Sequence, residues 1–259
     1  MPTLHSRADV FSPRHFFSWM ALTASAGAVN AGAYLACQQF VAHVTGTATQ
    51  LALDAGALWL IADSAAVLCC FVIGSTASAL VIEGRHERGL RPYFSLPLVT
   101  VVTLLSTVAV LGWRGAFGRF GGTSDQPADL VLISLLSLAM GAQNAAVASS
   151  TGMIVRTTHL TGPSTDLGLH LAKLFTAESG DSRRRAMRES ALRAGLVLSF
   201  IGGAVLMIPL ARTVQYLGFT VPAGLILLST LLSFVPKEVN GAEKARDDAR
   251  REHAAASSQ

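Results

Sequence analysis

The sequence predicts an all-α membrane protein with six transmembrane helices, arranged as two inverted repeats of three helices. Composition is the first observation behind this prediction. The chain is 51% hydrophobic and only 14% charged, and its mean hydropathy is +0.47, whereas a soluble domain carries roughly 25% charged residues. The second observation is the number of apolar stretches long enough to cross a bilayer. The third is a pair of related polar motifs, one in each half of the chain.

Six stretches approach the roughly 20 apolar residues that a membrane-spanning helix needs. They are residues 16–40, 58–82, 94–112, 129–150, 192–212 and 215–235. A cleavable signal peptide is the alternative for the first stretch. However, its sequence GAVNA returns as GAQNA in the fourth stretch, which is internal and cannot be a signal. We therefore expect the first stretch to be a retained transmembrane helix.

The basic residues predict the orientation of these helices. If the N-terminus lies in the cytoplasm, all but three of the 20 Lys and Arg residues fall in cytoplasmic segments. The exceptions are Arg114, Arg119 and Arg212. This asymmetry follows the positive-inside rule and predicts that both termini are cytoplasmic. It also accounts for the sequence pI of about 9.3, so the lipid bilayer is the expected partner and nucleic acid is not.

An internal repeat relates the two halves of the chain. GAVNA (27–31) and GAQNA (141–145) agree at four of five positions, and HVTGTATQLAL (43–53) and HLTGPSTDLGL (159–169) agree at six of eleven. FVIG (71–74) likewise resembles FIGG (200–203). Because each copy would contain three spans, an odd number, the second copy is predicted to be inverted relative to the first, as in many secondary transporters.

The repeat divides the chain into five parts. The expected parts are an N-terminal cytoplasmic tail (1–15), repeat 1 (16–112), a connecting loop (113–128), repeat 2 (129–235) and a charged cytoplasmic tail (236–259).

The His-x-Thr-Gly motif of each copy predicts a break in the membrane helices. Val and Thr before the glycine favour an extended backbone, and Gly46 and Gly162 would permit a turn. The residues that follow have a helical pattern, with Thr45 and Thr161 as candidate N-caps. Each copy is thus expected to contain a short extended strand that leads into a half-helix. The free N–H groups and the dipole at such a helix start favour an anion or a polar ligand group.

If the two copies face each other, their motifs form one site, for which the sequence offers three groups of residues. The candidate ligand-binding residues are Thr45, Gly46, Thr47, Thr161, Gly162, Ser164 and Thr165. The candidates for proton or polar coupling are His43, Gln50, Asp54, His159, Asp166 and His170, since ionisable groups in a membrane are costly and tend to be functional. Asn30 and Asn144 are expected to hydrogen-bond the broken backbone. A structural cap or hydrogen bond is the alternative role for His43 and His159.

Metal binding and enzymatic catalysis are not predicted. Asp166 and His170 have a metal-ligand spacing, but no third ligand accompanies them. The three cysteines lie in apolar stretches without a CxxC pair, which indicates neither a disulfide framework nor a zinc site. No GxSxG or HExxH motif occurs, so we expect no cofactor, no metal and no enzymatic activity.

The two motif regions resemble those of a known family. At AGAVNAGAYLACQQFVAHVTGTATQLAL and GAQNAAVASSTGMIVRTTHLTGPSTDLGLHL, the chain resembles the YoaK family of uncharacterised bacterial membrane proteins, over residues 16–235. In the first copy that family more often has Asp and Asn-Met-Thr-Gly-Asn where this chain has Asn30 and residues 43–47. The resemblance implies a multi-pass protein of the bacterial inner membrane.

These features predict a small secondary transporter or channel-like carrier. A polar solute would bind between the two half-helix N-termini, and the basic balance and the helix dipoles favour an anionic one. The alternative is a non-transporting membrane scaffold or assembly subunit, in which the paired motifs only lock the two halves together. Six spans are few to enclose a pathway, so a homodimer is an alternative to a monomer.

Overall fold

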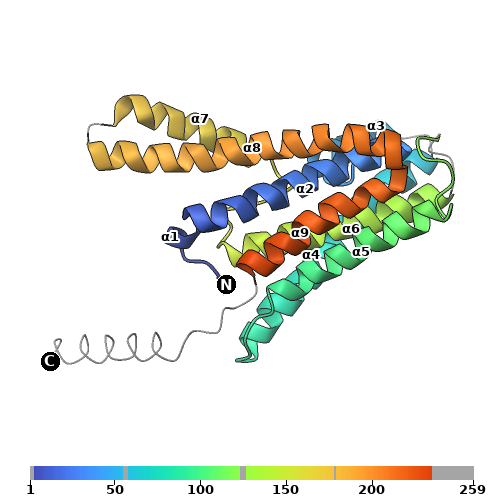
Figure 1. Cartoon of the computed structure of the whole chain (residues 1–259), viewed down its shortest axis with the longest axis horizontal. Coiled ribbons are helices and arrows are strands. Elements are labelled where there is room, and N and C mark those ends of the chain that lie inside the picture. Colours follow the sequence, from blue (N-terminus) through green and yellow to red (C-terminus); the bar gives the residue numbers. More distant parts are fainter. Residues whose placement is uncertain (1–2, 55–57, 123–126, 178, 235–259) are drawn as a thin grey trace.

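The chain folds into helices joined by short turns (Figure 1). The computed structural model describes residues 3–54, 58–122, 127–177 and 179–234. Its elements are α1 (Arg7–Val10), α2 (Pro13–Cys37), α3 (Val44–Leu53), α4 (Leu58–Glu87), α5 (Ser95–Trp113), α6 (Pro127–Ser150), α7 (Thr161–Thr176), α8 (Gly180–Val214), the 3-10 helix η1 (Gln215–Phe219) and α9 (Thr220–Ser233). No strand occurs among the described residues. The predicted charged tail, 236–259, lies outside them.

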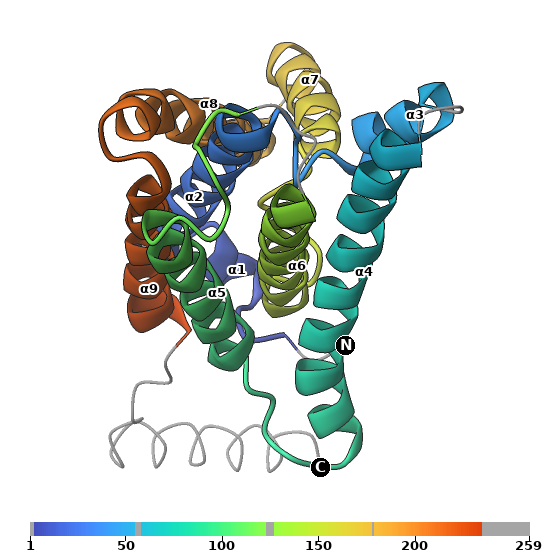
Figure 2. The same ribbon diagram turned by 90° about the vertical axis from the view of Figure 1, so that its right-hand side faces the viewer.

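The long helices lie side by side in a bundle (Figure 1), and Figure 2 views this bundle from one end, with α4 still seen along much of its length. The short helix α3 lies near one end of this bundle, and the hairpin of α7 and α8 forms the opposite end. The chain runs along α8 from the hairpin to the other end, reverses at η1, and returns as α9.

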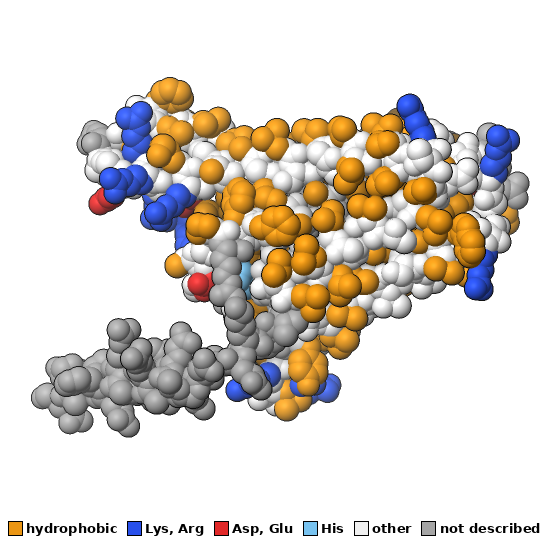
Figure 3. Space-filling model, in the orientation of Figure 1, with side chains coloured by type: hydrophobic (Ala, Val, Ile, Leu, Met, Phe, Trp, Pro, Cys, Tyr) orange, Lys and Arg blue, Asp and Glu red, His pale blue; other side chains and the backbone are white. Residues whose placement is uncertain are grey.

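The helices are those of a multi-pass membrane protein. Five segments of the described chain are long and apolar enough to cross a membrane, namely His15–Cys37, Leu60–Glu87, Ser95–Trp113, Pro127–Ser150 and Gly180–Ser233. The last of them contains α8, η1 and α9. The predicted sixth span is therefore not a separate long helix, because α9 has 14 residues, fewer than the roughly 20 that span a bilayer straight across. In Figure 3, the Lys and Arg side chains lie at the left and right ends and at the lower edge of the visible face, and its middle is largely apolar.

Helices α2 and α8 approach each other so closely that their backbones touch. A Cβ atom at Gly27 would lie 2.0 Å from the carbonyl oxygen of Phe200, and one at Gly203 would lie 1.8 Å from the carbonyl oxygen of Ala24. Inside a membrane, small residues stabilise helix pairs by allowing this close packing. The glycines therefore set the distance between α2 and α8.

Helices α4 and α6 form a second close pair with the same arrangement. A Cβ atom at Gly141 would lie 2.0 Å from the carbonyl oxygen of Phe71, and one at Gly74 would lie 2.1 Å from the carbonyl oxygen of Leu138. In both pairs, a glycine meets the carbonyl group that lies three residues before the partner glycine. Each pair combines one helix from the first half of the chain with one from the second.

The N-terminal residues, predicted as a tail, pack against the bundle as far as the structure describes them. The N–H group of His5 donates to the carbonyl oxygen of Ser150, at 3.0 Å. The indole Nε1 of Trp19 donates to the carbonyl oxygen of Val10, also at 3.0 Å. The side chain of His5 is buried and contacts the rings of Trp19 and Phe234 edge-on.

We expect the packing of His5 to make the protein sensitive to acid. Burial, together with the nearby charge of His15, lowers the pKa of His5 from 6.5 to about 4. The unfolded chain thus binds a proton that folded His5 excludes, so stability falls as the pH drops from 6.5 toward 4. The expected loss is on the order of 2 kcal/mol. Thermal unfolding of the purified protein in detergent across this range measures it. The substitution His5→Phe should flatten the profile, and an unchanged acid slope would contradict this origin.

Candidate functional site

A cavity of about 330 Å³ lies between the starts of α3 and α7. Six of its wall residues come from the first half of the chain and six occupy the matching positions of the second half. These pairs are Asn30 and Asn144, Ala42 and Thr158, His43 and His159, Val44 and Leu160, Thr45 and Thr161, and Phe71 and Phe200. The remaining wall residue is Arg156. Arg156 stands three residues before His159, and the residue at the same distance before His43 in the first half is Phe40.

The two helix starts present first-turn residues at this cavity. Helix α3 begins at Val44 and α7 begins at Thr161, and neither start has a side-chain hydrogen bond as a cap. The prediction of Thr45 and Thr161 as N-caps is therefore wrong: both residues belong to the first turn. Because the first N–H groups of a helix lack partners within it, uncapped donors are left at both starts.

The segments that precede these helix starts are irregular. Residues 38–43 and 151–160 consist of turns, bends and unclassified backbone in the structure, so the prediction of short strands is wrong for them. Val and Thr favour an extended backbone, but a strand also needs a neighbouring strand to accept its N–H groups. No such neighbour is present among the described residues.

Side-chain amides replace the missing strand partners. The Oδ1 atom of Asn30 accepts hydrogen bonds from the N–H groups of Val41, at 3.1 Å, and of Ala42, at 3.0 Å. In the second half, Oδ1 of Asn144 accepts one from the N–H group of Thr158, at 3.3 Å. Buried N–H groups need such acceptors, so each asparagine fixes the segment that leads to its helix start.

The histidines of the two motifs lie over the glycines that follow them. A Cβ atom at Gly46 would lie 2.0 Å from Cδ2 of His43, and one at Gly162 would lie 3.1 Å from Cε1 of His159. Both glycines are helical, and neither has a positive φ. They therefore provide space for the imidazole ring and not the turn that the sequence predicts. Both rings are exposed and line the cavity.

The predicted coupling residues on α3 and α7 lie outside the cavity and connect each half-helix to its neighbour. Asp54 accepts a hydrogen bond from Nε2 of Gln50, at 2.6 Å, and one from Oγ of Ser64 on α4, at 3.5 Å. In the second half, Oδ2 of Asp166 lies 3.1 Å from Nε of Arg193 on α8. The described residues contain no group of three His, Cys, Asp or Glu side chains that could hold a metal ion.

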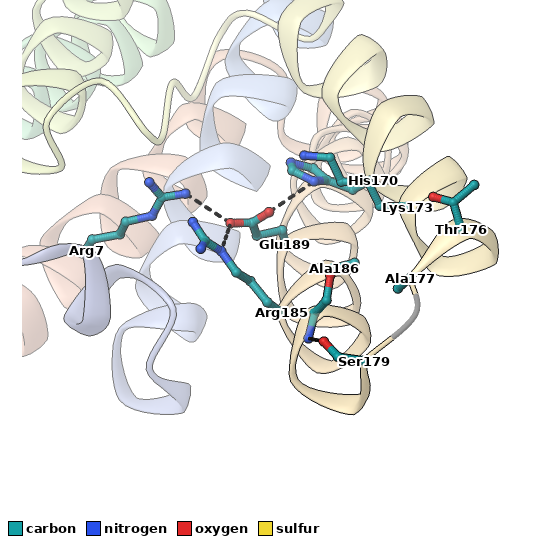
Figure 4. Close-up of a pocket in the computed structure, with 10 residues that line it drawn as sticks. Arg7, His170, Lys173, Thr176, Ala177, Ser179, Arg185, Ala186 and Glu189 are labelled. Atoms are coloured by element: carbon teal, nitrogen blue, oxygen red, sulfur yellow. Dashed lines mark hydrogen bonds and ion pairs between the residues drawn. The ribbon is translucent and has the colours of Figure 1, made fainter.

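His170 belongs to a separate cluster around a buried carboxylate between α1, α7 and α8 (Figure 4). Glu189 is 7% exposed. Its carboxylate lies 3.0 Å from Nη2 of Arg7, 3.3 Å from Nε of Arg185 and 3.0 Å from Nδ1 of His170. A groove of about 720 Å³ adjoins the cluster. The cluster joins three elements, and its two arginines share one carboxylate, so it keeps a net positive charge.

Among the predicted binding residues, Thr45 and Thr161 line the cavity. The hydroxyl group of Thr47 donates to the carbonyl oxygen of His43, at 2.9 Å, and that of Thr165 donates to Thr161, at 3.0 Å. These two hydroxyls are thus used within their own helices. Gly46, Gly162, Ser164, Thr47 and Thr165 do not line the cavity, although Gly162 lines a neighbouring cavity of about 190 Å³.

Seven wall residues were not among the predicted site residues, namely Ala42, Val44, Phe71, Arg156, Thr158, Leu160 and Phe200. Phe71 and Phe200 stand in the repeated FVIG and FIGG segments, and that repeat was the available signal for them. Arg156 carries no repeated signal, since only one half of the chain has a charge at this position.

A comparison with known families places the whole bundle in one of them. The family model described as "Protein of unknown function (DUF1275)" matches residues 18–232, which include every residue of the cavity wall. The chain belongs to this family. No curated protein and no solved structure matches it. The DUF1275 match, over residues 18–232, covers nearly the same residues as the resemblance to the YoaK family, over 16–235. The description of the matching family does not include the name YoaK. Because the DUF1275 description states no activity, the function is inferred from the cavity.

Proposed function

We propose that this DUF1275 protein is a small secondary transporter or channel-like carrier, which binds a polar solute in the cavity between the starts of α3 and α7. The observation that carries the proposal is that matching residues from the two halves line one cavity. Half-helices whose N-termini meet at a central site bind the substrate in many transporters with inverted repeats. Irregular backbone at membrane depth is tolerated where it lines such a cavity.

The packing of the long helices supports two inverted three-helix repeats. The contact of α2 with α8 recurs as the contact of α6 with α4, through glycines at matching positions. In this arrangement α9 is a short sixth span. The end of the bundle that holds Arg7 and the α7–α8 hairpin is richest in basic residues, and we assign it to the cytoplasm of a bacterial inner membrane.

A scaffold, in which the motifs only lock the two halves together, would need no open space beside them. The asparagines do fix the segments before the helix starts. However, other polar side chains, which take no part in these hydrogen bonds, line a cavity. This favours a carrier. The proposal assigns no catalytic residue, and it is compatible with a monomer or a homodimer.

Removing the two hydroxyl groups at the helix starts is expected to impair the carrier. In the part of the chain that the structure describes, the hydroxyls of Thr45 and Thr161 donate to no protein acceptor, and both line the cavity. Each hydrogen bond to a solute contributes about 1 kcal/mol, so the loss of both in Thr45→Val/Thr161→Val should slow transport roughly thirtyfold at low solute concentration. Light scattering of reconstituted vesicles measures the swelling rate in iso-osmotic solutions of small amides, polyols and carboxylate salts.

Two exposed threonines of α5 provide the control. Their hydroxyls bond only to their own helix, so Thr100→Val/Thr103→Val should swell like the wild type. Vesicles with wild-type protein that swell no faster than empty ones in every solute would favour the scaffold.

A further inference from the structure

The wall of the cavity offers hydrogen-bond donors to whatever fills it. Asn30 is 8% exposed and lines the cavity. Its Oδ1 atom is occupied by the N–H groups of Val41 and Ala42, which fixes the orientation of the amide. Its NH₂ group donates to no acceptor within the described ranges. The side chain is largely buried and its free donor lies at the cavity wall, so this amide points to a ligand that accepts hydrogen bonds.

The second half supplies a matching donor. Asn144 uses its Oδ1 atom for the N–H group of Thr158, and its NH₂ group likewise has no acceptor among the described residues. The uncapped starts of α3 and α7 add backbone N–H groups and the positive ends of two helix dipoles. Of the residues that the structure describes, no Asp or Glu lines the cavity. The wall is therefore suited to an acceptor that carries negative charge.

One full positive charge breaks the symmetry of this wall. Arg156 lines the cavity, whereas its counterpart in the first half is Phe40. Within the described structure Arg156 has no ion pair, and its side chain hydrogen-bonds only weakly, to Sδ of Met153 at 3.8 Å. A guanidinium group forms strong paired hydrogen bonds with a carboxylate. A single such group suits a ligand with a single anionic head.

The wall also has an apolar part, and the volume of the cavity exceeds that of an ion. Phe71 and Phe200 line the cavity from the two halves of the chain, and Ala42, Val44 and Leu160 complete the apolar part. The cavity of about 330 Å³ falls at the lower end of the range of small-molecule sites, about 300–1,000 Å³. A chloride ion would leave most of this space unfilled.

We infer that the cavity binds a small organic monocarboxylate, whose carboxylate is held by Arg156 and the amide groups of Asn30 and Asn144 while its apolar part packs against Phe71 and Phe200. This inference rests on the proposed function, because it assigns a substrate class to the same cavity.

The test compares carboxylates with their neutral amides. Thermal unfolding of the purified wild-type protein in detergent is followed with sodium benzoate or sodium butyrate, with benzamide or butyramide, and with sodium chloride at equal concentration. The carboxylates should raise the melting temperature in a saturable way, while the amides and chloride should not. Arg156→Gln should weaken carboxylate binding at least tenfold, and Arg156→Lys should retain part of it. The exposed Arg119, which does not line the cavity, is the matched control as Arg119→Gln.

Three results would overturn the inference. If the amides stabilise as strongly as the carboxylates, the solute is neutral, and the proposed carrier stands while this inference falls. If sodium chloride alone gives the full shift, or if Arg156→Gln binds benzoate like the wild type, the carboxylate assignment is wrong. If no probe binds and no solute enters vesicles, both proposals fall. Should Arg156→Gln fail to fold, the comparison of benzoate with benzamide on the wild type still decides.

Discussion

Gly203→Ala is expected to destabilise the protein by about 3 kcal/mol or more, the upper range for overpacking a core. The added methyl group would lie 1.8 Å from the carbonyl oxygen of Ala24. Because that atom belongs to a helix backbone, no change of side-chain rotamer relieves the overlap. Helices α2 and α8 must move apart, which loses contacts along both. The melting temperature of the purified variant in detergent measures the effect.

The neighbouring glycine is the matched control. A Cβ atom at Gly202 would meet no atom within 4 Å, and alanine is favoured over glycine inside a helix by up to about 1 kcal/mol. Gly202→Ala should therefore melt at the wild-type temperature or slightly above it. In the other helix pair, Gly74→Ala should reproduce the loss, since its methyl group would lie 2.1 Å from the carbonyl oxygen of Leu138. Equal melting temperatures for Gly202→Ala and Gly203→Ala would contradict the backbone contact.

Asn30→Leu is expected to cost about 2–5 kcal/mol. The substitution removes the acceptor of two buried N–H groups, those of Val41 and Ala42, and each unsatisfied buried donor costs about 1–3 kcal/mol. The segment before α3 should loosen, and the first turn of α3 with it. Thermal unfolding and amide hydrogen exchange of residues 38–47 measure the two consequences.

Two variants control this prediction. Asn30→Asp keeps an oxygen acceptor at the same place and should retain most of the stability. Asn144→Leu removes a single and longer hydrogen bond, of 3.3 Å to the N–H group of Thr158, and should cost less than Asn30→Leu. If Asn30→Leu unfolds like the wild type, the amide does not hold this segment.

The central features of the site could be predicted because they occur twice in the sequence. The repeated GA-x-NA and His-x-Thr-Gly motifs identified both helix starts, the histidines and the asparagines. Two copies of one motif predict one shared location if the copies face each other, and the structure has a cavity that both copies line. A repeat therefore revealed long-range proximity that no local pattern contains.

Local patterns were less informative about backbone and direction. Val and Thr predicted strands before the helices, but Asn30 and Asn144 accept hydrogen bonds from those segments while standing on the preceding helices, α2 and α6, which propensity cannot anticipate. The spacing of Gln50 with Asp54 correctly places both on one helical face. It does not show that this face meets α4 instead of the cavity.

A side chain without a repeated counterpart was the hardest to predict. Arg156 resembles any basic residue in a polar segment of the sequence. Only the geometry of the two helix starts brings it to the cavity wall.

The two glycine-mediated helix pairs have a consequence for how the molecule can move. Each pair, α2 with α8 and α4 with α6, joins one helix from each half of the chain in backbone contact. The first half therefore cannot swing as a rigid block against the second without breaking both pairs. The cavity has walls from both pairs, with Asn30 and Phe200 on one and Asn144 and Phe71 on the other. A motion that exposes the cavity to alternate sides of the membrane would rock the α2–α8 pair against the α4–α6 pair. The half-helices α3 and α7, which lie toward opposite ends of the bundle (Figure 1), would move with these pairs.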